Sequence, residues 1–378
     1  MRPKFEEGGK LHAFHSLFDA MDTFFYTPEQ TTVSGCHIRD AVDNKRTMFT
    51  VVIALIPALL FGMYNIGYQH YLSLGQVSCY CDNFWGNLGY GFLKILPMLL
   101  VSYIVGLGIE CIFAQIRKHE VSEGYFVTGM LIPLICPPDV PLWQLAIAVA
   151  FAVIIGKEVF GGTGYNFLNP ALIARAFLFF SYPSQMSGDN VWIAEQGDAI
   201  SGATPLGEML AGGITPHASA LEMFLGFIPG SVGETSVVAI LIGAVILLVT
   251  GIASWRIMLS IFAGGAAMGL VFNMIGANPY MEMPFYYHFL IGGFMFGAVF
   301  MATDPVTAAQ TNIGKYIYGA LIGIMAVLIR VLNPAYPEGM MLSILLLNVF
   351  APLIDYYVVE ANIRRRAKRT KLLAKNNQ

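Results

Sequence analysis

One short polar stretch of the sequence carries residue types that suit a covalent modification. Thr204 follows Ser201, Gly202 and Ala203, and Asp198 lies shortly before them. The threonine hydroxyl is a nucleophile that can form a phosphoester, and the two small residues before it would let a modifying enzyme reach it. Ser, Thr, Gly and Asp are also the residues that form turns and helix N-caps. The stretch by itself is compatible with a modification site or with an ordinary turn.

A glycine-rich stretch, residues 161–169, contains two further candidates, Asn166 and Asn169. Glycine backbone permits close approach of a ring or a phosphate, and amide side chains both donate and accept hydrogen bonds. Together they suit the polar edge of an isoalloxazine ring. The stretch is neither a Walker loop nor a strand-linked GxGxxG, so a nucleotide-binding fold has little support. Asn169 precedes Pro170 and also fits the N-cap of a helix, and both roles are compatible.

Acidic residues within apolar stretches form a third group of candidates. Glu110 follows Gly106 and Leu107, and an ionisable group at membrane depth is costly and often functional. A structural hydrogen bond, or a salt bridge with Arg117, is the alternative role for Glu110.

Two aspartates, Asp304 and Asp355, offer the oxygen ligands that a hard cation such as sodium prefers. Phe296 and Phe300 lie one helical turn apart just before Asp304, and such a pair either narrows a pore or packs in the core. An ion path and a structural role are both open for the two acids.

Composition places these candidates in a membrane. The chain has 378 residues, of which 56% are hydrophobic and 12% are charged, whereas soluble domains carry roughly a quarter charged residues. The first 45 residues are too polar for a signal peptide. The five cysteines and seven histidines have no metal-ligand spacing, so we expect free thiols and no tightly bound metal.

The hydropathy pattern predicts an all-α membrane protein with ten transmembrane helices. A helix that spans the hydrocarbon core needs about 20 apolar residues. The candidate spans are 47–68, 92–114, 125–137, 142–156, 165–182, 236–254, 257–276, 285–303, 316–332 and 340–359. Several are short, which favours broken helices that line a site. Asn-Pro-Ala occurs at 169–171 and again at 333–335, in matching places of two five-helix halves, which predicts an inverted repeat.

Basic residues set the predicted orientation. Lys and Arg near the span ends fall on one side under this count, and the stretch 183–234 contains none. We therefore expect both termini in the cytoplasm and Thr204 outside. The predicted divisions are a cytoplasmic arm with an interfacial helix (1–45), a first repeat (46–182), an extracytoplasmic loop with the Thr204 motif (183–234), a second repeat (235–360) and a basic tail (361–378).

Long strings across the whole chain resemble the B subunits of sodium-translocating NADH:quinone oxidoreductases. They are RKHEV (117–121), KEVFGGTG (157–164), FLNPAL (167–172), GIASWR (251–256), MATDPV (301–306) and NPAYPEGMM (333–341). The D subunits of the related ferredoxin:NAD oxidoreductase complexes share the motif at Thr204 and the second Asn-Pro-Ala region. An arm like residues 25–40 favours the B subunits.

This resemblance implies a bacterial inner-membrane complex with five other subunits, which passes electrons from NADH to quinone and moves sodium outward. It implies that a flavin transferase attaches FMN covalently to Thr204, and that Asn166 and Asn169 contact noncovalent riboflavin. It places quinone near Gly106, Leu107 and Glu110. Family members carry two adjacent glycines there, so Leu107 departs from the pattern.

Two other classes fit part of the sequence. A channel or solute carrier without redox chemistry would also use broken helices and an inverted repeat, and a membrane scaffold would need no cofactor. The flavin-attachment motif favours a redox protein over both. The chain has no dinucleotide-binding motif and no cysteine cluster, so we expect no NADH oxidation by this chain alone, and nothing points to a nucleic acid.

Overall fold

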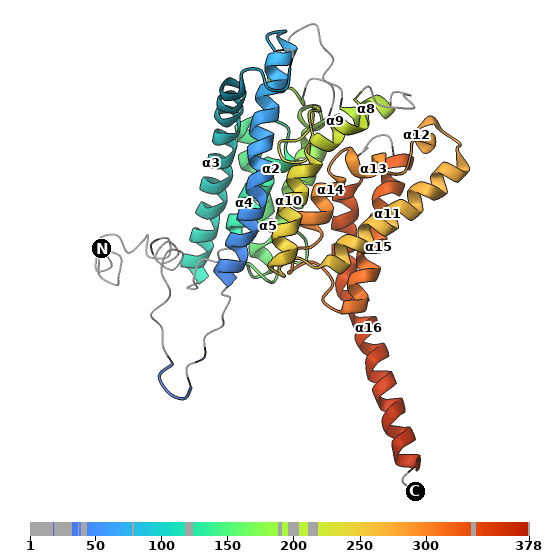
Figure 1. Ribbon diagram of the computed structural model, residues 1–378. Helices are drawn as coiled ribbons and strands as arrows, with labels where there is room; N and C mark the ends of the chain where they lie inside the picture. The colour runs from blue at the N-terminus through green and yellow to red at the C-terminus, as the bar shows by residue number, and fades with distance from the viewer. Residues whose placement is uncertain are drawn as a thin grey trace.

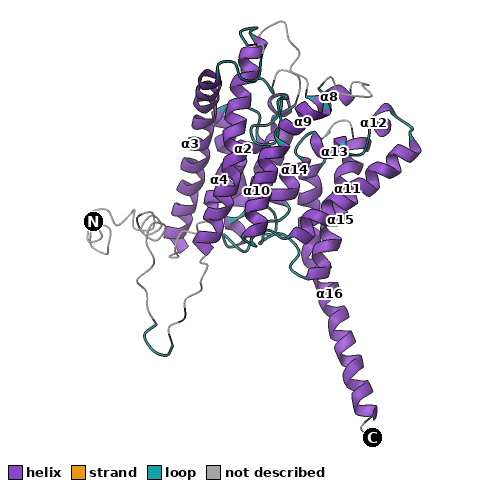
Figure 2. Ribbon diagram, viewed as in Figure 1, coloured by secondary structure: helices purple, strands orange, loops and turns teal. Residues whose placement is uncertain are grey.

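The computed structural model describes residues 18, 32–36, 38, 44–77, 79–117, 124–187, 191–195, 204–210, 218–333 and 338–376. Within these residues all regular structure is helical (Figure 2), which agrees with the predicted fold class. Except for Phe18, the interfacial helix predicted in the N-terminal arm lies outside the described residues.

The described helices pack together as a bundle (Figure 1). The first half contains α2 (Asn44–Ser73), α3 (Phe84–Arg117), α4 (Tyr125–Ile135), α5 (Leu142–Gly156), η3 (Glu158–Phe160), α6 (Pro170–Ser181) and α7 (Pro183–Met186). Two short helices follow, α8 (Pro205–Leu210) and α9 (Ala220–Leu225). The second half contains α10 (Val237–Val249), α11 (Trp255–Ile275), α12 (Pro279–Glu282), α13 (Tyr287–Leu290), α14 (Phe294–Phe296), η4 (Gly297–Met301), α15 (Asn312–Leu332) and α16 (Met340–Asn376).

Six of the described helices are long and apolar enough to cross a bilayer, namely α2, α3, α5 continued through η3, α11, α15 and α16. Helices α4, α6 and α10 are apolar but shorter. Together these nine match nine of the ten predicted spans. The arrangement of ten helices as two inverted repeats stays a prediction.

The predicted span 285–303 is not one continuous helix. It is divided into α13, α14 and η4, the last of which is a π-helix. The break falls at Gly292, whose φ of +66° is a conformation that side chains with a Cβ rarely adopt. A Cβ there would also lie 3.1 Å from the guanidinium of Arg330. Hydropathy predicts a continuous span because the residues around the break are apolar.

The short helix α4 ends against the segment that leads into α10. Its backbone oxygen at Leu134 accepts a hydrogen bond from Gly233 N at 2.7 Å, and Cys136 O accepts one from Val232 N at 3.3 Å. Backbone groups within a bilayer need partners inside the protein, and these two bonds supply them. These bonds hold α4 next to that segment.

Helix α16 has 37 residues, whereas about 20 suffice to span the hydrocarbon core. The helix continues through Asn376, so most of the predicted basic tail at 361–378 is helical. In Figure 1 this end of α16 projects away from the bundle.

Glycines let the longest helices approach each other closely. A Cβ on Gly323 of α15 would lie 2.1 Å from Ile261 O of α11, and a Cβ on Gly264 would lie 2.3 Å from Ala320 O. Such small residues are typical of tightly packed membrane helices. The α11–α15 pair is therefore held at a spacing that leaves no room for a methyl group.

We expect Gly323→Ala to destabilise the protein, because the added methyl must push α15 away from α11. Overpacking of this kind costs about 1–3 kcal/mol, measurable as a lower thermal midpoint in detergent. Gly89→Ala in α3 is the matched control, since a Cβ there meets no atom within 4 Å. Equal midpoints for the two variants would contradict the close packing of α11 and α15.

Candidate functional site

A cavity lies at the end of the bundle where α2 begins and α10 ends. Its empty volume, including the solvent-open mouth, is about 770 Å³. Its walls are mostly apolar, and the polar residues that line it include Lys157, Thr163, Asn166, Asn169, Thr303 and Asp304. A largely apolar cavity with a few convergent polar groups is typical of a ligand site.

Asn169 faces this cavity from the start of α6. Its Oδ1 accepts a hydrogen bond from Ala171 N at 3.0 Å, which is the N-cap predicted from the sequence. Its Nδ2 donates to Asp304 Oδ2 at 3.4 Å. The residue is buried. The structure thus joins a candidate flavin contact and a candidate sodium contact, which lie far apart in the sequence.

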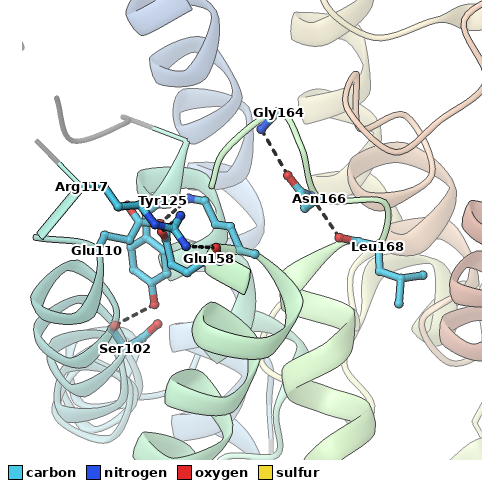
Figure 3. A network of polar contacts seen from close by, with 9 residues as sticks. Ser102, Glu110, Arg117, Tyr125, Glu158, Gly164, Asn166 and Leu168 are labelled. Carbon is cyan, nitrogen blue, oxygen red and sulfur yellow. Dashed lines mark hydrogen bonds and ion pairs between the residues drawn. The ribbon is translucent and has the colours of Figure 1, made fainter. Parts of the chain in front are cut away.

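Asn166 holds the glycine-rich loop in shape. Its Oδ1 accepts from Gly164 N at 3.3 Å, and its Nδ2 donates to Leu168 O at 3.0 Å (Figure 3). The loop needs its glycines, since φ at Gly161, Gly162 and Gly164 is positive. Asn166 also lines the cavity, but both of its polar atoms already have partners in the loop.

Thr163 was not singled out from the sequence. Its Oγ1 is buried and makes no hydrogen bond to any described residue, and the residue lines the cavity. A buried hydroxyl without a partner is unusual and needs an explanation such as a bound group. No sequence signal distinguishes Thr163 from any other loop threonine.

Glu110 pairs with Lys157, and both side chains are almost completely buried. The predicted alternative, a salt bridge from Glu110 to Arg117, is wrong. Arg117 instead donates to Glu158 O at 2.7 Å and lies 3.4 Å from its carboxylate (Figure 3). The loop after α5 brings the two neighbouring residues Lys157 and Glu158 against α3, which spacing along α3 alone does not reveal.

Gly106 has a packing role. A Cβ on Gly106 would lie 1.9 Å from the ring of Tyr125, whose hydroxyl donates to Ser102 O at 2.8 Å. Leu107 is partly buried and packs against the core. Lys157 Nζ lies 5.9 Å from the Tyr125 ring centre. The quinone contacts predicted at Gly106, Leu107 and Glu110 stay predictions.

Phe296 and Phe300 pack together with ring centres 5.0 Å apart. Both are buried, and of the two only Phe300 lines the cavity. Phe300 belongs to the π-helix η4, a distortion that is frequent at functional sites. The pair thus has the packing contact expected of core aromatics, and one member also faces the site.

Asp355 lies in α16, where it contacts the residues just before α15. Its carboxylate accepts hydrogen bonds from Gln310 N at 2.6 Å and from Thr311 N at 3.0 Å. Thr311 in turn caps α15 by accepting from Gly314 N. Asp355 therefore ties α16 to the start of α15, and it does not line the cavity that Asp304 faces.

Thr204 lies at the start of α8, and its hydroxyl accepts a hydrogen bond from Gly207 N at 3.1 Å. The N-cap interpretation of the motif therefore applies to Thr204, whose side chain is half-buried. Helix α8 lies at the end of the bundle opposite the C-terminus of α16 (Figure 1). Asp198, Ser201, Gly202 and Ala203 lie outside the described residues.

A polar clasp fixes the chain shortly before that motif. Glu195 Oε1 lies 2.8 Å from Lys94 Nζ, Glu195 Oε2 accepts from the Tyr90 hydroxyl at 3.1 Å, and Glu195 N donates to Asp139 at 2.9 Å. The hydrogen bonds from Lys94 and Tyr90 lower the pKa of Glu195. The clasp holds residues 191–195 against α3 over the pH range in which this carboxylate is ionised.

Buried charges also connect the two halves of the bundle. Arg175 of α6 pairs with Glu338, and its guanidinium lies 3.6 Å from Glu234. Arg330 donates to His288 O at 2.7 Å and to Glu338 O at 3.3 Å. In the sequence, Glu234 differs from the other acids of its loop only by its place just before the apolar run of α10.

The chain matches the model of the NQR2, RnfD, RnfE family over residues 31–364. It is 51% identical to a protein of Ectopseudomonas mendocina over 97% of this chain and 96% of the relative. It is 50% identical to one of Chromohalobacter salexigens, over 98% and 95%, and 49% identical to one of Azotobacter vinelandii, over 97% and 96%. Each of these relatives is named as the B subunit of Na(+)-translocating NADH-quinone reductase.

We expect Lys157→Met to destabilise the protein strongly, because it removes the ammonium that faces the buried Glu110 carboxylate. Breaking a buried ion pair costs about 3–5 kcal/mol, whereas the double variant Lys157→Met with Glu110→Gln should recover most of the loss. Unfolding midpoints in detergent measure both. Arg364→Ala, which breaks an exposed pair with Glu360, should change stability by less than about 1 kcal/mol. If Lys157→Met and the double variant were equally stable, the energetic coupling between Lys157 and Glu110 would be refuted.

Proposed function

The chain belongs to the NQR2, RnfD, RnfE family, and we propose that it is the membrane-embedded B subunit of a sodium-translocating NADH:quinone oxidoreductase. The observation that carries this proposal is the full-length similarity to proteins of that name at about half identity. The family model also covers the related D subunits, whereas the relatives of about half identity are each named as B subunits. The chain acts as part of the oxidoreductase, with partners that supply NADH oxidation.

Thr204 is the proposed attachment point of FMN, which supplies one-electron transfer when bound. Its hydroxyl is half-buried at the head of α8, and Gly207 N donates to that oxygen at 3.1 Å. An ester oxygen at this position could keep the same hydrogen bond. The small Gly207, whose added Cβ would come within 3.6 Å of the hydroxyl oxygen, leaves space around it. The local structure therefore fits the modification.

The cavity is the proposed site of noncovalent riboflavin. Its apolar walls suit the faces of a planar ring, and Thr163, Asn169 and Lys157 provide polar groups among the residues that line it. The Thr163 hydroxyl, which makes no hydrogen bond to any described residue, and the second N–H of the Asn169 amide are the groups proposed to hydrogen-bond a ring edge. Asn166 contributes by fixing the shape of the loop that carries Thr163 and Asn169. Quinone is proposed to bind near Glu110, which pairs with Lys157, and near Gly106, which packs against Tyr125.

The proposed sodium path passes Asp304 and Phe300, which line the same cavity, with Phe296 packed behind. Asp355 has a structural role in the contact of α15 with α16. The ends of the bundle also differ in charge, since Lys45, Arg117 and Arg256 lie at the end with the cavity mouth and α8 lies at the other (Figure 1). This supports a cytoplasmic cavity and an outward Thr204. In the proposed inverted repeat, the third segments are the short helix α4 and the divided segment from α13 to η4.

Thr204→Ala should abolish covalent flavin. Protein matured beside its transferase and run on a denaturing gel should fluoresce under ultraviolet light, and the variant should not, because the nucleophilic oxygen is gone. Ser219→Ala, which also removes an N-cap hydroxyl near the same end of the bundle, should fluoresce normally. A fluorescent Thr204→Ala band would rule out this attachment point.

Asn169→Leu should release noncovalent riboflavin while covalent FMN stays. Leucine removes the amide that faces the cavity and introduces an apolar group beside Asp304. We expect a loss of riboflavin retained after gel filtration of about tenfold or more, equivalent to roughly 1.4 kcal/mol of binding free energy, measured by fluorescence of the acid-soluble fraction. Full retention in a folded variant would remove Asn169 from the flavin site.

A further inference from the structure

The last part of α16 extends well beyond the bundle. The Asp355 carboxylate accepts hydrogen bonds from Gln310 N and Thr311 N, directly before α15 begins, so Asp355 marks the level at which the bundle ends. Helix α15 has 21 residues, and its length of about 31 Å matches the thickness of the hydrocarbon core. Residues 356–376 continue α16 by roughly 30 Å past that level, and Figure 1 shows this end projecting away from the other helices.

This projecting end is strongly basic and uncovered. Every residue from 361 to 370 is exposed. The same stretch contains no acidic residue and five basic ones, namely Arg364, Arg365, Arg366, Lys368 and Arg369. Like charges three or four positions apart destabilise a helix, as between Arg364 and Lys368 or between Arg366 and Arg369. An anionic partner would relieve this repulsion.

The basic side chains leave one narrow strip of the helix free. Four small or apolar residues recur at intervals of three or four positions and so share one side of α16, namely Val359, Ile363, Ala367 and Thr370. Val359 and Ile363 are 46% and 55% exposed although they are apolar. At about 100° per residue, Arg366 borders one edge of this apolar strip and Arg364 the other. Such a surface is typical of a helix that lies in a groove of a partner protein.

Lipid headgroups are the alternative partner for a basic helix. They extend roughly 5–8 Å beyond the hydrocarbon core, and salt screens their charge over about another 8 Å. Arg369 lies roughly 21 Å past Asp355 along the helix, which is beyond that reach. A basic helix that binds lipid lies in the plane of the interface, whereas α16 continues away from the bundle (Figure 1). Both the length and the direction of α16 therefore favour a protein partner.

We propose that the projecting end of α16 docks into a groove on another subunit of the same complex, with its apolar strip on an apolar floor and its arginines against acidic rims. The inference rests on the proposed function only in that this chain works as one subunit of a complex, with α16 ending in the cytoplasm. Complementary charge gives such a contact its specificity, and the apolar strip fixes which side of the helix enters the groove.

The test is photo-crosslinking within the purified complex, with p-benzoylphenylalanine in place of Ile363 at the centre of the apolar strip. We expect irradiation to join this chain to one partner subunit. Mass spectrometry of the joined peptides should place the contact on apolar residues of the partner that are flanked by Asp or Glu.

Two single charge reversals form a matched pair on this background. Arg366→Glu puts an acid beside the strip and against an acidic rim, so the crosslink yield should fall about tenfold or more, because like charges in contact are strongly unfavourable. Arg365→Glu makes the same change of charge on the opposite side of the helix, and the yield should stay within about twofold. Arg366→Lys keeps the charge and should keep the crosslink. An acid at position 366 lies one turn from Arg369 and favours the helix, so melting of α16 does not explain a loss.

The outcomes separate this inference from the proposed function. Crosslinks to lipid alone, to no subunit, or to a partner surface without acidic residues would overturn the docking proposal while leaving the function intact. Equal losses for Arg365→Glu and Arg366→Glu would also overturn it, because the contact would then have no preferred side. Unmodified protein that purifies without any other subunit would instead refute the proposed role in a complex. Unchanged thermal midpoints verify that each variant is folded.

Discussion

Polar groups inside a lipid-embedded bundle must find their partners within the protein, and this requirement joins the two halves of the chain. Breaks in the helices expose backbone groups, which the structure satisfies across the halves, as between Leu134 and Gly233. Buried charges follow the same rule, since Arg175 reaches Glu338 and Glu234 from the other half. These contacts hold the two halves of the chain together, and residues of both halves line the cavity.

The chemistry of the cavity depends on the few polar residues that line it. Lys157 is already engaged with Glu110, and Asn166 is engaged within its own loop. The cavity is also lined by Asn169, by Asp304 and by Thr163, whose hydroxyl makes no hydrogen bond to any described residue.

Much of the fold could be predicted, because long apolar runs without breaks become helices close to their expected ends, as in α5 at 142–156. The N-cap at Asn169 could also be predicted, since Asn before Pro has a local reason to cap. The break at Gly292 could not, because it depends on the buried Arg330 that approaches it.

The candidate site was less predictable, because its contacts join residues far apart in the sequence. Arg117 is close to Glu110 along the chain, but the loop after α5 brings Lys157 to that carboxylate instead. The different roles of Asp304 and Asp355 likewise depend on tertiary contacts, since only Asp304 lines the cavity.

The most direct test of the flavin-carrying role is a flavin inventory of the purified complex by mass spectrometry. Cleavage after glutamate should release residues 196–208, which contain Thr204 between Glu195 and Glu208. We predict that this peptide carries the mass of one FMN, with fragmentation placing it on Thr204 and not Ser201, and that the acid-soluble fraction holds riboflavin. An unmodified peptide from protein matured beside its transferase, with no flavin in either fraction, would contradict the redox role and favour an ordinary permease.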